Sequence, residues 1–492
     1  MKSSSNSILK GTIAFLSSSL IVRITAVISQ FALGWFLTKE DYGIYGIALS
    51  LNGLVACFQE NSILKLLIQK ADYFDEWKDA GFSLSLIFTI LASVLLVLGA
   101  YFYGYQIGQP AILPISICVA LAMAIGFPVA VYRARATSDL RFSEVAGIEA
   151  TKNVFAQLMV IPLAAIGFGP MSFVLPRPFA RVIEIICYRR CLPELKIGCF
   201  WRNVTWSRLI KLVLDVRWLM LASLMTAIAM QGDYFVLGML VSSGTIGVYF
   251  FGFQLVSSFS AIFSSAMNSI LMPVLCSIKS DRSAQYDMYT KTYRFALALG
   301  FPLFYFAALI IGPTIHFIWK GKWDESIVVC QLLLLALPLR FLLTLVRALL
   351  ESQGRWRAAS LIVGLNAVGV LAAACVGGLL GNVEGIVISV VCWQVGYSIS
   401  GVIVSFIYLG ISDAWGNTKT MIRFIGIYVG LLLYLHFTGF EIFHETTLSR
   451  VIFPLLFYVS VSSGLSYICC RREWLEVFSF LSNIYKRRQG RA

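Results

Sequence analysis

Three ionisable residues within an apolar stretch of the chain are spaced so that they share one helical face. Arg177, Arg181 and Glu184 lie four and three residues apart in "LPRPFARVIEII", and residues at these spacings are neighbours on a helix. A guanidinium offers a planar fork of donors that matches carboxylate or phosphate oxygens, so this face predicts a site for an anionic group. Pro176 and Pro178 flank Arg177. Because proline removes a helix donor, the segment is either a broken helix that lines a site or a helix start near the outer surface.

A second polar stripe surrounds Arg23, which lies in the middle of an apolar run with no acid within four residues. Thr12, Ser19 and Gln30 fall on the same helical face as Arg23. The stripe indicates a wet wall on which Arg23 contacts an anion, or else a salt bridge from Arg23 to Glu60 or Asp233 on another segment.

Two further cations interrupt apolar runs. Lys152 follows Glu149 by three residues, a spacing that predicts an internal ion pair. Arg340 follows Pro338 and shares a helical face with Arg347 and Glu351. The candidates for binding an anionic substrate are therefore Arg23, Lys152, Arg177, Arg181 and Arg340.

Acidic residues within apolar runs are fewer than the cations there. They are Glu60, Glu149, Glu184 and Asp233, and the cationic excess favours an anionic substrate. Asp233 has no cation nearby in the sequence. Asp233 and Glu60 are candidates for a coupling ion, H⁺ or Na⁺, while capping or pairing with another segment are equally good readings of Asp233.

The composition indicates whether water or a lipid bilayer surrounds most of these 492 residues. The chain is 59% hydrophobic and 13% charged, whereas soluble proteins have about 25% charged residues, so the bilayer must surround most of it. The three histidines and scattered acids leave little for metal or acid–base chemistry. The eleven cysteines suggest no disulfide framework and lack the spacing of a zinc site. We expect no enzyme activity, metal or cofactor.

Long apolar segments are the elements that must position these charges. A helix needs about 20 mostly apolar residues to cross the hydrocarbon, and continuous runs exclude a β-barrel. The sequence predicts an all-α polytopic membrane protein with about fourteen transmembrane helices. They cover residues 11–37, 43–68, 80–104, 110–132, 146–167, 170–188, 214–240, 245–272, 293–318, 326–350, 358–380, 384–410, 421–439 and 450–470.

The distribution of the net charge of +14 supports this count. One set of alternate loops, together with both termini, holds 27 Lys and Arg residues, and the other set holds 4. Because cytoplasmic loops carry the basic excess, we expect a multi-pass protein with both termini in the cytoplasm. The positive charge is spread over one face of the membrane, where it lies beside membrane lipid. Nucleic acid is therefore not expected as a partner.

An internal repeat gives the predicted domains. At an offset of 204 residues, the hairpin that begins at Phe31 matches the one that begins at Phe235, and Gly43 and Tyr45 match Gly247 and Tyr249. Glycine there lets helices approach closely and tyrosine suits the membrane interface. Six spans separate the copies, which predicts two pseudo-symmetric six-helix bundles. The domains are 1–190, the first bundle; 191–213, a cytoplasmic basic linker; 214–410, the second bundle; 411–470, helices 13 and 14; and 471–492, a cytoplasmic basic tail.

The chain resembles the Wzx-type flippases, the polysaccharide transporter (PST) family of the MOP superfamily, over nearly its whole length. Three segments carry the resemblance: "FALGWFLTKEDYGIYGIALS" at residues 31–50, "YRARATSDLRFSEVAGIEATKNV" at residues 132–154 and "FIWKGKWDESIVVCQLLLLALPLR" at residues 317–340. The resemblance implies a MOP/MATE-like fold of two bundles. It also implies that undecaprenyl-diphosphate-linked oligosaccharide is moved across the bacterial inner membrane by alternating access.

Such a flippase serves exopolysaccharide, capsule or O-antigen (lipopolysaccharide) biosynthesis, with a polysaccharide polymerase and a chain-length regulator as partners. The alternatives are a MATE-like cation-coupled drug antiporter, a lipid II flippase and, in a different class, a membrane-embedded polysaccharide polymerase. Drug antiporters of the superfamily usually have twelve spans and a more acidic lumen. A polymerase needs a large outer loop, which this sequence lacks.

Overall fold

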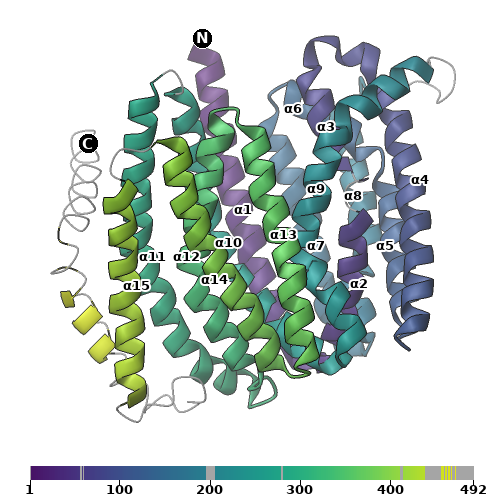
Figure 1. The fold of residues 1–492 in the computed structure, drawn as a ribbon. Helices are drawn as coiled ribbons and strands as arrows, with labels where there is room; N and C mark the ends of the chain where they lie inside the picture. The colour runs from purple at the N-terminus through teal and green to yellow at the C-terminus, as the bar shows by residue number, and fades with distance from the viewer. Residues whose placement is uncertain are drawn as a thin grey trace. The chain divides into compact units, whose positions relative to one another are not determined.

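The computed structural model describes residues 2–55, 58, 60–195, 206–278, 281–410 and 414–437, with isolated residues between 456 and 471. This described part contains fifteen α-helices and two short 3-10 helices and no strand (Figure 1). It forms two compact units, residues 1–250 and 251–492, and the boundary falls within helix α10 (Ser243–Ser277). The predicted all-α class is therefore confirmed.

The first unit contains the helices before α10 and the first turns of α10. They are α1 (Lys2–Phe36), α2 (Lys39–Val55), α3 (Glu60–Gln69), η2 (Ala71–Tyr73), α4 (Phe74–Gln106), α5 (Ile112–Gly126), α6 (Val129–Ser138), α7 (Phe142–Ile166), η3 (Gly169–Phe173), α8 (Pro176–Cys191) and α9 (Trp206–Leu240). The second unit continues with α11 (Arg282–Trp319), α12 (Ser326–Ser352), α13 (Trp356–Leu379), α14 (Val383–Leu409) and α15 (Ala414–Phe437).

Eight of the described helices are long and apolar enough to cross a membrane, and the bent pair α5 and α6 makes a ninth. The predicted second span, 43–68, is not one continuous helix, because α2 ends at Val55 and α3 begins at Glu60. Most of the predicted span 450–470 and of the tail 471–492 lies outside the described residues. The count of fourteen spans and the division into bundles 1–190 and 214–410 stay predictions.

Local sequence sets the ends of several helices. Gly167 ends α7 with a φ of 96°, and the next amide, of Phe168, donates to the Leu163 carbonyl at 3.1 Å, as in a helix that closes on a left-handed glycine. Asn382 caps the start of α14, and its side chain accepts from the Gly385 amide at 2.7 Å. Such caps satisfy backbone groups that a helix end leaves open.

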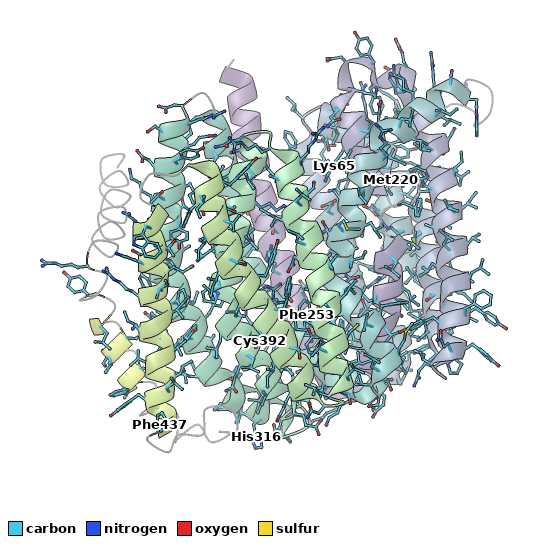
Figure 2. All side chains as sticks on the ribbon, viewed as in Figure 1. Lys65, Met220, Phe253, His316, Cys392 and Phe437 are labelled. Atoms are coloured by element: carbon cyan, nitrogen blue, oxygen red, sulfur yellow. The ribbon has the colours of Figure 1, made fainter. Side chains whose placement is uncertain are left out.

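The short helix α3 has two different faces. Ile63, Leu64, Leu66 and Leu67 are buried in a cluster with residues of α4, α6 and α9. Lys65, which is labelled in Figure 2, is exposed. A long side chain of this kind can extend along apolar surface to place its charge in polar surroundings.

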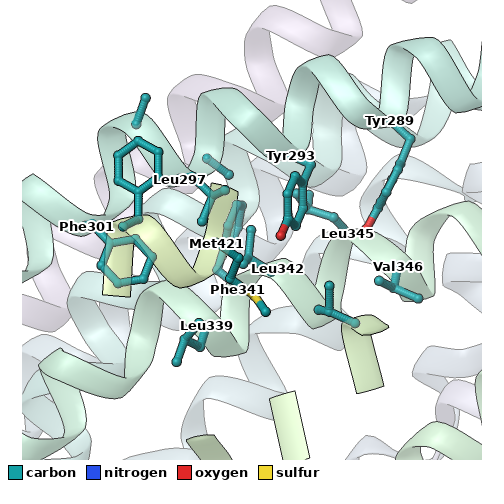
Figure 3. Close-up of a cluster of buried hydrophobic side chains, with 14 of the residues drawn as sticks. Tyr289, Tyr293, Leu297, Phe301, Leu339, Phe341, Leu342, Leu345, Val346 and Met421 are labelled. Atoms are coloured by element: carbon teal, nitrogen blue, oxygen red, sulfur yellow. The ribbon is translucent and has the colours of Figure 1, made fainter. Parts of the chain in front are cut away.

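An aromatic core holds the second unit together (Figure 3). Tyr289, Tyr293, Phe301 and Tyr305 recur at helical spacing on α11 and pack against α14 and α15. Phe424 and Tyr428 of α15 contact the Phe301 ring at centroid distances of 6.0 and 5.7 Å. The predicted thirteenth span, 421–439, thus corresponds to α15, which is anchored to α11 by ring contacts.

Candidate functional site

The site built around the first predicted motif lies on α8 in the first unit. The 3-10 helix η3 leads into α8, and α8 begins at Pro176. Pro176 and Pro178 stand in the first turn, where a missing amide costs no intrahelical bond. A helix therefore starts at Pro176, and Arg177 lies in the first turn of α8; the role of this segment in lining a site stays a prediction.

The two faces of α8 differ in chemistry. Phe179, Val182 and Ile186 are exposed large apolar residues at three- and four-residue spacing, which suits contact with lipid. Arg177, Arg181 and Glu184 lie on the opposite face of the helix. The predicted common face of these three residues is therefore present, and it is turned away from the apolar exposed side.

Glu184 is the centre of the charged face. Its Oε1 accepts from Lys152 Nζ of α7 at 2.8 Å, and its Oε2 accepts from Arg181 Nη1 at 2.8 Å. The carboxylate is fully buried, whereas the Lys152 and Arg181 side chains keep 16% and 25% of their surface exposed. The sequence-based analysis grouped the two cations as candidates but did not identify Glu184 as the acid that joins them.

The pair predicted between Lys152 and Glu149 is not the pair in the structure. Glu149 instead binds Arg133 of α6, with 2.6 Å between Oε1 and Nη2. Lys152 turns toward α8, because the packing of α7 on α8 brings Glu184 within reach. Residue spacing identifies neighbours on the same helix, but it cannot predict which residues of a second helix pack against them.

A glycine makes room for the Arg181 side chain. A Cβ at Gly126, the last residue of α5, would lie 3.0 Å from both Cδ and Nε of Arg181. Directly after Gly126 the chain turns by 47° between α5 and α6, where Pro128 begins the new direction. The guanidinium therefore packs against the bend of a broken helix.

Arg177 meets an aromatic group in place of a carboxylate. Its Nη2 donates to the hydroxyl of Tyr45 from α2, and the Tyr45 ring stacks on Phe173 with 4.0 Å between centroids. Tyr45 is buried, so its ring packs against protein.

The matching tyrosine of the repeat binds an acid. Tyr249 donates to Asp233 Oδ2 at 3.0 Å, and Asp233 Oδ1 accepts from the Tyr234 amide at 3.0 Å. Both Tyr249 and Asp233 are buried. Asp233 therefore stays a candidate for a coupling ion with a defined set of donors, while the side chain of Glu60, the other candidate, lies outside the described residues.

The last two candidate cations are on other helices, Arg23 on α1 and Arg340 on α12. Arg23 Nε donates to Ser19 Oγ on its own helix at 3.4 Å, and no carboxylate of the described residues lies within 4.0 Å of the guanidinium. The alternative salt bridge to Asp233 is thus not formed here. Arg340 is half-buried on α12 in the second unit, and Arg347 on the same helix binds Glu351 at 2.7 Å.

The two glycines of the repeat lie directly against each other. A Cβ at Gly43 would lie 1.8 Å from the Ser243 carbonyl oxygen, and one at Gly247 would lie 1.7 Å from the Lys39 oxygen. The contact is reciprocal, since Lys39 and Ser243 are also related by the offset of 204. The prediction that glycine permits a close approach is right, but the helices concerned are α2 and α10, one from each copy.

A family model described as polysaccharide biosynthesis protein matches residues 32–328, which is more than half of the chain. The chain belongs to the polysaccharide biosynthesis protein family. Its matched region contains α8, the charged face and both copies of the repeat. No curated protein matches the chain in sequence.

Solved structures show the fold. The lipid II flippase MurJ in an inward closed conformation is 13% identical with a TM-score of 0.71, covering 94% of this chain and 99% of that one. An inward-facing multidrug resistance MATE transporter of the MOP superfamily is 14% identical, with a TM-score of 0.59 and coverage of 81% and 98%. The Vibrio cholerae MATE transporter VcmN, as a mutant, is 12% identical, with a TM-score of 0.56 and coverage of 84% and 99%. The chain therefore has a MurJ- and MATE-like membrane fold, as the resemblance implied, and these neighbours are flippases and transporters rather than enzymes.

Proposed function

We propose that the protein is a flippase that moves undecaprenyl-diphosphate-linked oligosaccharide repeat units across the bacterial inner membrane. The observation that carries this proposal is the coincidence of a polysaccharide biosynthesis family with a transporter fold in one chain. A polysaccharide pathway that uses a transporter needs its building blocks carried across a bilayer. The fitting pathways are exopolysaccharide, capsule and O-antigen biosynthesis, with a polymerase and a chain-length regulator as partners.

The charged face of α8 supports the chemistry of the proposal. Lys152, Arg177 and Arg181 stand with one acid, Glu184, so the face carries an excess of positive charge. Guanidinium and ammonium groups bind phosphate oxygens through charge-assisted hydrogen bonds. We therefore assign the diphosphate to this face, with Arg23 and Arg340 as further contacts during alternating access.

Coupling of transport to H⁺ or Na⁺ would involve Asp233. It is a buried carboxylate whose oxygens accept from Tyr249 and from a backbone amide, and such a group is costly in the membrane unless it has a function or a partner. Glu60 is the second candidate for this role.

A lipid II flippase is the second candidate function, because MurJ aligns with 94% of the chain. Expression in cells depleted of MurJ separates the two. Rescue of growth would establish lipid II transport. Failure to rescue, by protein present at normal abundance in the membrane, would leave the oligosaccharide flippase.

Deletion of the gene tests the main proposal. The deletion should stop polymer export and leave lipid-linked repeat units on the cytoplasmic side, and a plasmid copy should restore both. Normal polymer output in the deletion, in a strain with no second flippase, would defeat the assignment. A change in drug sensitivity without a polymer defect would point instead to a MATE-like antiporter.

A further inference from the structure

The charged groups at the α8 site differ in how deeply they are buried. Glu184 is fully buried, while the two cations that bind it remain partly exposed. Because the exposed apolar residues of α8 are on its other side, the exposed part of Arg181 lies away from that apolar side. The carboxylate thus stands behind the cations, out of reach of an incoming anion.

We propose that Glu184 is a positioning residue that holds Lys152 and Arg181 toward the substrate diphosphate and limits how tightly they bind it. This inference rests on the proposed function, since it concerns the same substrate. Each carboxylate oxygen takes one cation at 2.8 Å. A lysine ammonium has three donors, so Glu184 fixes the direction of Lys152 while using one of them.

The charge balance of the face supports this role. One acid serves two cations, which leaves the trio with an excess of one positive charge. Arg177, whose hydroxyl partner Tyr45 is neutral, lies one turn from Arg181 and adds a second. A sugar–diphosphate–lipid diester carries one negative charge on each phosphate, so the face matches the charge of that headgroup.

The carboxylate also affects release. A transported substrate must leave the site, and three cations without an acid would hold a diphosphate too long. Glu184 repels the phosphates from behind the cations. At a separation of one side chain and an effective dielectric constant of about 20, its removal should strengthen diphosphate binding by about tenfold or more.

The test uses the full-length protein in lipid nanodiscs and a synthetic farnesyl-diphosphate N-acetylglucosamine diester as the probe. Glu184→Gln should bind the probe about tenfold or more tightly than wild type. In proteoliposomes it should move a fluorescent version of the probe more slowly. This opposite change in affinity and turnover is not expected of a residue that only supports the fold. Glu149→Gln is the matched control, because Glu149 binds only Arg133 among the salt bridges of the described residues, and both quantities should stay within about twofold of wild type.

The outcomes separate the two proposals. If the wild type binds no probe, the proposed function and this inference both fail. If the wild type binds and folded Glu184→Gln binds equally or more weakly, only the inference fails.

A second pair of variants tests the inference even if Glu184→Gln alone does not fold. In a Lys152→Gln background one cation is already absent, so loss of Glu184 leaves a smaller charge imbalance. Lys152→Gln with Glu184→Gln should bind the probe more tightly than Lys152→Gln alone. Equal or weaker binding by the double variant would overturn the inference.

Discussion

Replacing Gly247 with alanine should destabilise the protein at the contact between the two copies of the repeat. The new Cβ would lie 1.7 Å from the Lys39 carbonyl oxygen and 3.0 Å from the Gly43 nitrogen. Carbon and oxygen atoms normally approach to about 3.3 Å, so α2 and α10 must separate locally by about 1.5 Å. The obstructing atoms belong to backbone, which cannot rotate away as a side chain can.

The size of the effect follows from the rigidity of that contact. Overpacking costs about 1–3 kcal/mol, and backbone obstruction places this substitution near the upper end. A loss of about 3 kcal/mol lowers the melting temperature of a large chain by about 5 °C. Differential scanning fluorimetry of the purified protein in detergent measures the change, and Gly43→Ala should produce a similar one. The double variant should lose less unfolding free energy than the sum of the two single variants, since both substitutions force apart the same pair of helices.

Gly147→Ala is the control for this prediction. Gly147 lies in α7, and a Cβ there would meet no atom within 4 Å. Alanine should raise helix stability at an open position by about 1 kcal/mol, so its melting temperature should equal or exceed that of wild type. A melting temperature for Gly247→Ala no lower than that of Gly147→Ala would refute the reasoning from the close contact.

Three further predictions concern other parts of the chain. Tyr249→Phe removes a donor from the buried Asp233 and should cost about 1–3 kcal/mol of unfolding free energy, measured by the shift in melting temperature. In a background without native cysteines, a cysteine at position 322 should react with an impermeant thiol reagent on intact cells, and one at position 283 should not, because we predict that the more basic set of loops is cytoplasmic. Burial, together with a nearby carboxylate, raises the pKa of the Cys191 thiol, so fewer thiolates are present at neutral pH and iodoacetamide should label Cys191 only at higher pH than it labels an ordinary thiol.

Each of these has a clear contrary result. Tyr105 is largely exposed, so Tyr105→Phe should leave the melting temperature unchanged; a shift equal to that of Tyr249→Phe would show that the Asp233 bond is not the cause. Labelling at both positions 283 and 322, or at 283 alone, would overturn the topology. Labelling of Cys191 with the pH profile of a small free thiol would contradict the effect of its partly buried setting and of the nearby carboxylate.

Features that depend on spacing within one helix could be predicted from the sequence. Apolar runs of membrane length gave the helices, and the four- and three-residue intervals placed Arg177, Arg181 and Glu184 on one face of α8. These predictions held because helical geometry alone determines which residues of a segment are neighbours.

Features that depend on contact between helices could not be predicted in this way. Lys152 had an acid three residues away, but it binds Glu184 on another helix. Tertiary packing determined this result, and a single sequence carries no direct record of which helices touch.

The internal repeat is visible in the sequence, and it also corresponds to a contact between helices. A chance resemblance between two hairpins gives no reason for their equivalent residues to meet, yet Gly43 and Gly247 do meet, each against the carbonyl four residues before the other. The backbone contact requires glycine in both copies, because no side chain fits there. Tyr45 and Tyr249 can bind different partners, since a hydroxyl can either accept or donate a hydrogen bond. Tyr45 accepts from the guanidinium of Arg177, and Tyr249 donates to the carboxylate of Asp233. The two matching hairpins thus share one close backbone contact, and their tyrosines bind groups of opposite charge, a guanidinium in one copy and a carboxylate in the other.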